Sequence, residues 1–543
     1  MINVFFILIS SILMSCGDFL KEYSKEYTYA TSCSDLDEVL IGGGYMKLKK
    51  DYTVSANTGY YSWLFVMDDD IEEYVTGTYK PNATTTNVAF RPFYGWAKEP
   101  FMNPEKGTVM TDVCWSQLYA HIALLNVVIS QVGEFTQDPE SMHRRITGEA
   151  QFLRGAYYYL LNNIYAKPYN RATAETDLGV PLKLTEYVDD HYYKRSANAA
   201  VYQQIVQDLK DAADNLVGVE QSTIYRANEI AARTLLSRVY LYMEEYDLAV
   251  KAANKVEGYT LYNLASRYTP GSGEAFLTAS LPEVIYTQGR EVMSYVHGGT
   301  GYVSKTYSSW IDENGNLQYG YIDVAYVMGD SYVVSDELLQ LFDANDVRYS
   351  AFFARSYQKN YLVSRKYRAA INEAIVETDP ITGTPVMPVV EGMDFNEVAS
   401  IRYAEVVLNK AEAQACAGDA GAVETMRQFL ETRYTVVPAI PASGSGLIEF
   451  IRRERQKELC FEGHRWFDLR RYAVNSVHKQ TIQVKHEWHT RTTSEAVLEG
   501  SYTLKAYDNT LKGDWMIPVP EDVINYCFPV LYNFERGNGV VKN

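Results

Sequence analysis

Residues 228–257 read NEIAARTLLSRVYLYMEEYDLAVKAANKVE, and the spacing within this stretch decides the fold. Ser237 is a small residue of the kind found where two helices cross closely. Tyr240, Tyr246, Ala249 and Val256 follow it at positions that tetratricopeptide-type helix pairs fill with aromatic and small residues. The stretch therefore predicts two antiparallel helices joined by a short turn.

Five further segments repeat apolar residues every three to four positions, which predicts amphipathic helices. They are residues 112–132, 145–165, 199–216, 400–417 and 447–472. Looser versions of the small-and-aromatic spacing occur at Gly155 and Tyr158 and within residues 404–417. Each pair alone is equally consistent with generic antiparallel helices. Together they predict a mainly α fold in which irregular tetratricopeptide-like helix pairs form a scaffold.

Long stretches between these segments have no helical period. Residues 69–111 contain several prolines and aromatic residues, and residues 266–333 are rich in glycine, serine and tyrosine. Residues 376–395 and 476–514 are further insertions. Asn314-Gly315 is a strong hairpin signal. Because long loops in compact proteins usually carry function, these stretches predict a loop-rich, partly β ligand-binding face.

The bulk composition excludes several classes of partner. The chain has 543 residues and a formal net charge of −18, which argues against nucleic acid and against an anionic membrane surface. After residue 15, no segment is predicted to cross a membrane. The six cysteines form no CxxC pair, so neither a zinc site nor a disulfide framework is indicated, and most are predicted to be buried.

The first 15 residues form a short apolar leader. The apolar run is shorter than the roughly 20 residues that a transmembrane helix needs, and it ends in small residues as secretory signals do. Leu13 and Ser15 precede Cys16 in the lipoprotein pattern, in which the cysteine sulfur takes a diacylglycerol and becomes the mature N-terminus. An ordinary signal peptide is the alternative, and no Lys or Arg precedes the apolar run. We predict an exported protein anchored by lipid at Cys16.

Five motifs occur in order along the chain. They are CGDFL at 16–20, QFLRGAYY at 151–158, RYAEVVLNKAEA at 402–413, RERQKELCFEGHRWFDLRR at 453–471 and WMIPVP at 515–520. In this order the chain resembles the SusD/RagB-like family, the surface nutrient-binding lipoproteins of Bacteroidetes, with the last motif similar to a closing strand. The charges in the fourth motif recur every three to four residues, so we expect them to pair along one helix face and to maintain the fold.

The resemblance implies a role at the outer face of the outer membrane. There the protein would cap a TonB-dependent SusC-like transporter, capture a polysaccharide or oligosaccharide and deliver it. It further implies a signal peptide at 1–15, a SusD-like helical-repeat region at 16–265, and a RagB/SusD-like region with the ligand-face loops at 266–543, as one compact unit. The alternatives are peptide capture as in RagB, a purely structural partner of the transporter, and a surface hydrolase.

The sequence gives little support to an enzymatic function. His486-Glu487-Trp488-His489 lacks the HExxH spacing, and no carboxylate pair is singled out. We therefore predict no enzyme, no cofactor and no metal site. Asp68-Asp69-Asp70 could hold Ca²⁺, but a solvated turn is the favoured interpretation, and residues 312–316 are interpreted as a hairpin turn rather than a calcium loop.

A sugar site needs flat aromatic faces for the apolar side of the ring and polar side chains for the hydroxyls. Two loops offer both kinds of residue. The candidates are Tyr94, Trp96, Arg91 and Asp70 in the first loop, and Tyr302, Tyr307 and Trp310 in the second. Loop packing or contact with the transporter is the alternative for these aromatic residues, while Trp115, Trp466 and Trp515 are assigned to the core.

Overall fold

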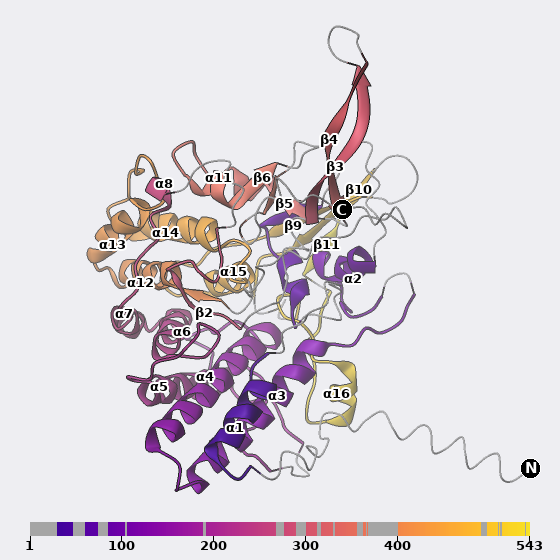
Figure 1. The fold of residues 1–543 in the computed structure, drawn as a ribbon. Helices are drawn as coiled ribbons and strands as arrows, with labels where there is room; N and C mark the ends of the chain where they lie inside the picture. Colours follow the sequence, from indigo (N-terminus) through magenta and orange to yellow (C-terminus); the bar gives the residue numbers. More distant parts are fainter. Residues whose placement is uncertain are drawn as a thin grey trace, which may run out of the picture.

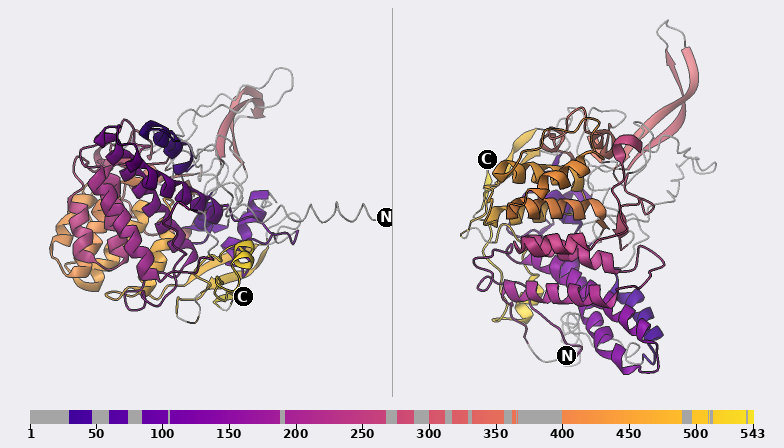
Figure 2. Two further views of the ribbon diagram at one scale, coloured as in Figure 1. Left: turned by 90° about the horizontal axis from the view of Figure 1, so that it is seen from below. Right: turned by 90° about the vertical axis from the view of Figure 1, so that its left-hand side faces the viewer.

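The computed structural model describes most of the chain. The described residues are 30–46, 60–73, 85–103, 106–187, 192–267, 276–288, 300–311, 317–328, 332–355, 362–364, 366, 400–489, 497–508, 510, 513–537 and 539–543. The helices stack as pairs on one side of the molecule, short sheets lie on the other, and a long hairpin projects from that sheet side (Figures 1 and 2). A mainly α scaffold with a partly β face is therefore confirmed.

The N-terminal half of the scaffold is a row of packed helices: α1 (Cys33–Val39), η2 (Leu40–Gly44), α3 (Val113–Gln131), η4 (Val132–Glu134), α4 (Glu140–Tyr165) and α5 (Asn198–Asn215). Helices α4 and α5 cross closely at Gly155. A Cβ added at Gly155 would lie 3.2 Å from Cβ of Asp208 and 3.2 Å from Cγ of Leu209. The small residue predicted at this crossing is thus required by the packing.

The helix pair predicted from residues 228–257 is present as α6 (Glu229–Tyr242) and α7 (Tyr246–Asn254). Ser237 is fully buried at their crossing, and its hydroxyl donates to the carbonyl oxygen of Ala249 at 3.1 Å. Because the Ser237 side chain is small and its hydroxyl is hydrogen-bonded to the facing helix, the two backbones can approach closely. The prediction for this stretch is confirmed.

The C-terminal helices continue the stack: α12 (Tyr403–Ala417), α13 (Gly421–Leu430), α14 (Gly444–Leu459) and α15 (Arg465–Val474) (Figure 2). The single helix predicted over 447–472 is wrong, because the chain turns between α14 and α15. Phe461 and Gly463 adopt φ of 62° and 75°, in the left-handed region that ends a helix.

Most charges of this motif pair across elements, although Lys457 with Glu454 and Arg471 with Asp468 pair within a helix. Arg402 donates to Glu458 on α14 at 2.7 Å, and Arg455 donates to Asp468 on α15 at 2.7 Å. Both arginines are at most 1% exposed. Pairing along one helix face, predicted for the charges from Arg455 to Asp468, is therefore wrong for that set, whereas the prediction that these charges hold the fold together agrees with their burial and pairing.

The β elements are small, apart from one hairpin. They are β1 (Ile71–Glu73), β2 (Val284–Tyr286), β3 (Thr300–Ile311), β4 (Leu317–Met328), β5 (Tyr332–Val334), β6 (Phe353–Arg355), β7 (Leu362–Ser364), β8 (Ile401–Arg402), β9 (Val484–His489), β10 (Leu498–Leu504) and β11 (Val540–Lys542). Strands β3 and β4 pair antiparallel from Thr300↔Met328 to Ile311↔Leu317, which confirms the predicted hairpin. The turn at 312–316 lies outside the described residues.

Short helical segments complete the described fold: η3 (Ser62–Val66), α2 (Thr85–Tyr94), α8 (Leu264–Arg267), α10 (Asp336–Leu339), α11 (Arg348–Phe352) and α16 (Glu521–Tyr526). The prediction that 69–111 lacks a helix is wrong at α2. Phe90, Phe93 and Tyr94 bury one helical face there, which outweighs the backbone bond lost at Pro92. The motif at 515–520 is not a strand but a turn followed by irregular chain.

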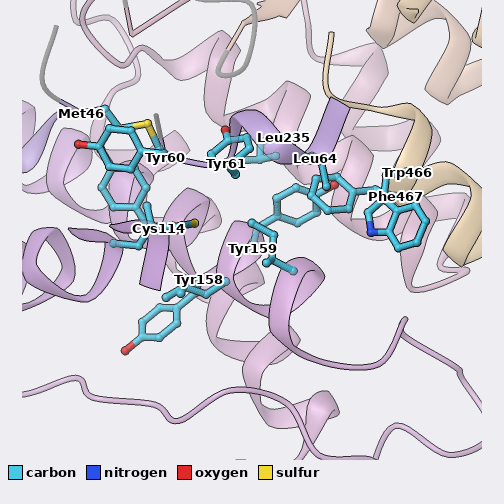
Figure 3. Packing of buried hydrophobic residues seen from close by; sticks show 14 of the residues in the cluster. Met46, Tyr60, Tyr61, Leu64, Cys114, Tyr158, Tyr159, Leu235, Trp466 and Phe467 are labelled. Atoms are coloured by element: carbon cyan, nitrogen blue, oxygen red, sulfur yellow. The ribbon is translucent and has the colours of Figure 1, made fainter. Parts of the chain in front are cut away.

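One large core holds the layers together (Figure 3). Trp466 and Trp515 stack at 5.4 Å between ring centroids, and Trp115 is also buried, so the assignment of these three residues to the core is confirmed. Among the described residues, the cysteines form no disulfide and are buried, as predicted for most cysteines: Cys33, Cys114, Cys416, Cys460 and Cys527.

Residues 113–134 of α3 and η4 are long and apolar enough to cross a membrane, contrary to the sequence prediction. Their apolar side chains, such as Leu118, Ile122 and Leu125, are instead fully buried in the core. This is the pattern of a core helix.

Candidate ligand-binding site

The first predicted loop folds onto strand β9 as a stack of three rings. The ring of His486 lies between the rings of Tyr94 and Trp96, with centroids 4.1 Å and 4.4 Å away. Trp96 also donates its Nε1–H to the carbonyl oxygen of Met67 at 3.1 Å. Tyr94 and Trp96 are 0% and 1% exposed, so both rings are covered as they stand.

Local backbone geometry explains this burial. Trp96 follows the C-terminal end of α2 with φ of 46°, which turns its side chain back toward the body of the protein. Strand β9 alternates buried and exposed residues, so His486 and Trp488 point inward. The aromatic pair predicted as a platform is therefore wedged against the sheet, and ligand contact by Tyr94 and Trp96 stays a prediction.

Hydrogen bonds fix the rings of this stack. Nδ1 of His486 lies 2.7 Å from the carbonyl oxygen of Tyr94, and Nε2 lies 2.9 Å from that of Asp68. Burial lowers the pKa of His486 to about 4, so the neutral ring donates one N–H to one of these carbonyls. The Tyr94 hydroxyl accepts from Glu73 N at 3.0 Å and donates to the carbonyl oxygen of Glu487 at 3.2 Å. Burial also raises the pKa of Tyr94.

Arg91 is half-buried at the edge of this stack. Its guanidinium lies 3.0 Å from the ring centroid of Trp488, in cation–π contact. The indole Nε1–H of Trp488 donates to Glu499 at 2.8 Å. Of the four candidates in the first loop, Arg91 therefore retains the most access to solvent.

Asp70 belongs to an acidic turn between η3 and β1. Asp69 accepts from Nε and Nη2 of Arg465 at 2.6 Å and 2.7 Å, and Gln456 donates to Asp70 at 2.9 Å. Burial raises the pKa of Asp68 well above its ordinary range and that of Asp70 to about 7. Burial acts the same way on Asp69, but the Arg465 guanidinium outweighs it and lowers the pKa of that carboxyl. Asp70 is 1% exposed, so its predicted contact with a sugar also stays a prediction.

The second predicted loop is strand β3 of the projecting hairpin. Tyr302 and Trp310 are eight positions apart and therefore lie on one face of the ribbon, whereas Tyr307 lies on the other. Opposite them in register are Tyr326, Gln318 and Tyr321, respectively. Sequence analysis grouped the three aromatic residues as one set, and the strand separates them into two faces.

The two predicted regions meet at one end of the molecule. Strand β5 starts at Tyr332, four residues after the last residue of β4, and it pairs with β1. The ring of Tyr332 lies 5.0 Å from that of Tyr94, by centroids. Figure 1 shows β5 and β9 beside the base of the hairpin. Sequence analysis interpreted 486–489 as a half-exposed strand or loop, which agrees with β9, but it did not place His486, Trp488 or Tyr332 beside the candidate residues.

The comparisons with known proteins agree with this architecture. A family described as starch-binding and associating with the outer membrane matches residues 66–241, and the SusD family matches residues 391–533. SusD-like protein P38 of Formosa agariphila is 24% identical over 405 residues, which cover 68% of this chain and 73% of that protein.

Solved structures share the fold over nearly the whole chain. A putative sugar binding protein of Bacteroides vulgatus superposes with a TM-score of 0.62 at 23% identity, covering 93% of this chain and 98% of that one. A laminarin binding SusD-like protein superposes with a TM-score of 0.54 at 22% identity, covering 83% and 92%. The stacked helix pairs and partly β face are thus a fold that these solved structures share. The chain belongs to the SusD/RagB-like family.

Proposed function

We propose that this protein is a cell-surface lipoprotein that binds a polysaccharide or oligosaccharide without catalysis and delivers it to a TonB-dependent SusC-like transporter. The observation that carries the proposal is family membership over both halves of the chain, including the match to the family described as starch-binding. The superposition on a laminarin binding protein also supports a glycan ligand.

The aromatic content of the hairpin supports a binding role for it. Strands β3 and β4 carry six aromatic residues, and their register divides them evenly between the two faces. One face carries Tyr302, Trp310 and Tyr326, and the other carries Tyr307, Tyr319 and Tyr321. Tyrosine and tryptophan offer flat apolar faces with a polar group at the edge, which suits the alternating character of a sugar ring.

The spacing along the hairpin favours an extended ligand. Tyr302 and Trp310 are eight residues apart, and at about 3.3 Å per residue they lie about 26 Å apart along the strand. A monosaccharide cannot reach both positions, whereas a chain of several sugar units can. We therefore propose that an oligosaccharide or polysaccharide, rather than a single sugar, is captured.

Membrane attachment and delivery complete the proposal. Cys16 lies outside the described residues, and its lipidation follows from the leader pattern alone. The net charge of −18 disfavours electrostatic attachment to anionic lipid, so the anchor is assigned to the lipid chains. Loss of the acyl chains from a Cys16→Ser variant, measured by mass spectrometry of the membrane fraction, tests this part.

Binding is tested on the soluble chain that starts at Gly17, titrated calorimetrically with a panel that includes starch and laminarin. A Tyr302→Ala, Trp310→Ala double variant removes aromatic residues from one face of the hairpin, and Tyr307→Ala alters the other face. We expect saturable binding that one of these variants weakens at least tenfold while the other retains it. Binding unchanged in both variants places the site away from the hairpin, and no binding to any glycan contradicts the proposed ligand class and favours peptide.

A further inference from the structure

Three consecutive carboxylates come together in the turn between η3 and β1. One carboxylate oxygen from each of Asp68, Asp69 and Asp70 lies within 4.8 Å of the others. The turn is held in this shape by a hydrogen bond from the Asp70 N–H to Oδ1 of Asp68 at 3.1 Å. Like charges this close repel one another, so the cluster requires compensation.

Burial makes that requirement stronger. Asp68 and Asp70 are 7% and 1% exposed. Oδ1 of Asp70 accepts from Gln456, but Oδ2 is buried and has no hydrogen-bond partner among the described residues. An unsatisfied buried polar atom costs about 1–3 kcal/mol, and more when it is charged. This unsatisfied oxygen is a second observation, beside the clustering, that points to a ligand at this position.

The neighbouring cations compensate the three carboxylates only in part. Arg465 neutralises Asp69 through two hydrogen bonds and lies 3.9 Å from Oδ1 of Asp70. Gln456 is neutral, and the His486 ring faces the backbone carbonyl of Asp68 rather than its carboxylate. Lys366, which pairs with Glu462, also acts electrostatically on Asp70. Among the described residues, two cations thus face the three carboxylates, and one of the two is shared with Glu462. A divalent cation would balance the remaining charge.

The donor atoms identify the class of cation. All candidate ligands are oxygens, and no thiolate or imidazole nitrogen joins the group of Asp68, Asp69 and Asp70, which disfavours zinc. Calcium accepts six to eight oxygens in flexible geometry, including carboxylates and water, whereas magnesium demands a strict octahedron. We propose that Asp68 and Asp70, assisted by Asp69, bind a calcium ion.

This ion would stabilise the region that carries the first set of ligand candidates. The residue before the cluster, Met67, accepts the Trp96 indole N–H, and Ser335 after β5 donates its hydroxyl to the Asp69 carbonyl oxygen at 2.7 Å. A cation held by the turn would therefore fix the chain segments at the base of the hairpin. The inference does not depend on the glycan proposal, because calcium binding is measured without glycan.

The experiment uses the soluble chain from Gly17, freed of metal with a chelator and titrated calorimetrically with CaCl₂. The same samples are melted with and without Ca²⁺. We expect one saturable site and a melting temperature that rises with Ca²⁺. Asp70→Asn keeps the shape of the side chain but removes its charge, and it should weaken binding at least tenfold and abolish the rise. Asp214→Asn, an exposed aspartate on α5, is the matched control and should bind as the parent does.

Two results would overturn the proposal. The first is an unaltered parent that takes up no Ca²⁺, in which case the buried carboxyls hold protons instead. The second is binding that persists equally in Asp70→Asn and in an Asp68→Asn variant, which assigns the calcium to diffuse surface charge. Because the first result is measured on the parent protein, the proposal can be tested even if a variant fails to fold.

Discussion

Replacement of Glu458 by glutamine tests the view that the most family-specific motif acts by holding the scaffold together. Glu458 is 0% exposed. It accepts from Arg402 at 2.7 Å, from Arg433 at 2.9 Å and 3.0 Å, and from Arg348 at 3.4 Å. These contacts hold the pKa of Glu458 well below its ordinary range although burial opposes ionisation.

The network around Glu458 is balanced in charge. Ion pairs among the described residues link five cations and five carboxylates, all of them nearly fully buried. They are Arg348, Lys366, Arg402, Arg433 and Lys457 with Glu283, Asp346, Glu454, Glu458 and Glu462. Glu458→Gln leaves this group with an uncompensated positive charge and turns an amide donor toward guanidinium donors. Breaking a buried pair in this way costs about 3–5 kcal/mol, which is roughly a 200- to 5,000-fold change in the unfolding equilibrium.

Urea denaturation at pH 7, followed by circular dichroism, measures the effect. Glu449→Gln is the matched control, because Glu449 lies on the same helix α14 with a side chain 52% exposed and only an exposed contact to His478. We expect the control to change the free energy of unfolding by less than about 0.5 kcal/mol. A Glu458→Gln protein within about 1 kcal/mol of the control would refute the reasoning.

Three further predictions follow from other parts of the scaffold. Gly155→Leu should destabilise the protein by about 1–3 kcal/mol in the same denaturation assay, because a side chain there meets Asp208 and Leu209. Gly133→Leu is the control, because a Cβ added at Gly133 has no atom within 4 Å. Burial favours the protonated form of Glu412, but Arg471 and Arg452 keep this carboxyl ionised. Its pKa is about 2, against an ordinary value of 4.5. Because this folded-state pKa is depressed, its stabilisation is complete above pH 4.5 and is lost as the pH falls toward 2, so Glu412→Gln should flatten the fall in melting temperature over that window. The five cysteines from Cys33 to Cys527 are buried, and burial raises the pKa of Cys460 to about 12, so a thiol reagent should label the folded protein from Gly17 slowly and the unfolded chain fully. Rapid labelling of the native protein would contradict the buried assignment.

The helical scaffold could be predicted because its signals are local. The period of apolar residues located α3 to α7, and the small Ser237 marked a crossing that the structure confirms. The break between α14 and α15 was missed, because the charges continue at helical spacing through a turn that only the backbone of Phe461 and Gly463 reveals.

The candidate site was less accessible to sequence reasoning. An aromatic residue in a proline-rich loop is expected to be exposed. Trp96 is instead buried against His486, on a strand almost 400 positions away in the chain. Likewise, three aromatic residues near one another in sequence were grouped as one set, whereas strand pairing separates Tyr307 from Tyr302 and Trp310. Long-range burial and strand register carry no local signal, so these features required the structure.

The most direct test of the account is the calorimetric titration of the soluble chain with starch, laminarin and related glycans. The account predicts saturable binding of an extended glycan, weakened at least tenfold by aromatic substitution on one face of the β3–β4 hairpin and unchanged by Glu449→Gln. Absence of binding to every glycan by a folded protein would contradict the central claim that this SusD/RagB-like protein captures carbohydrate.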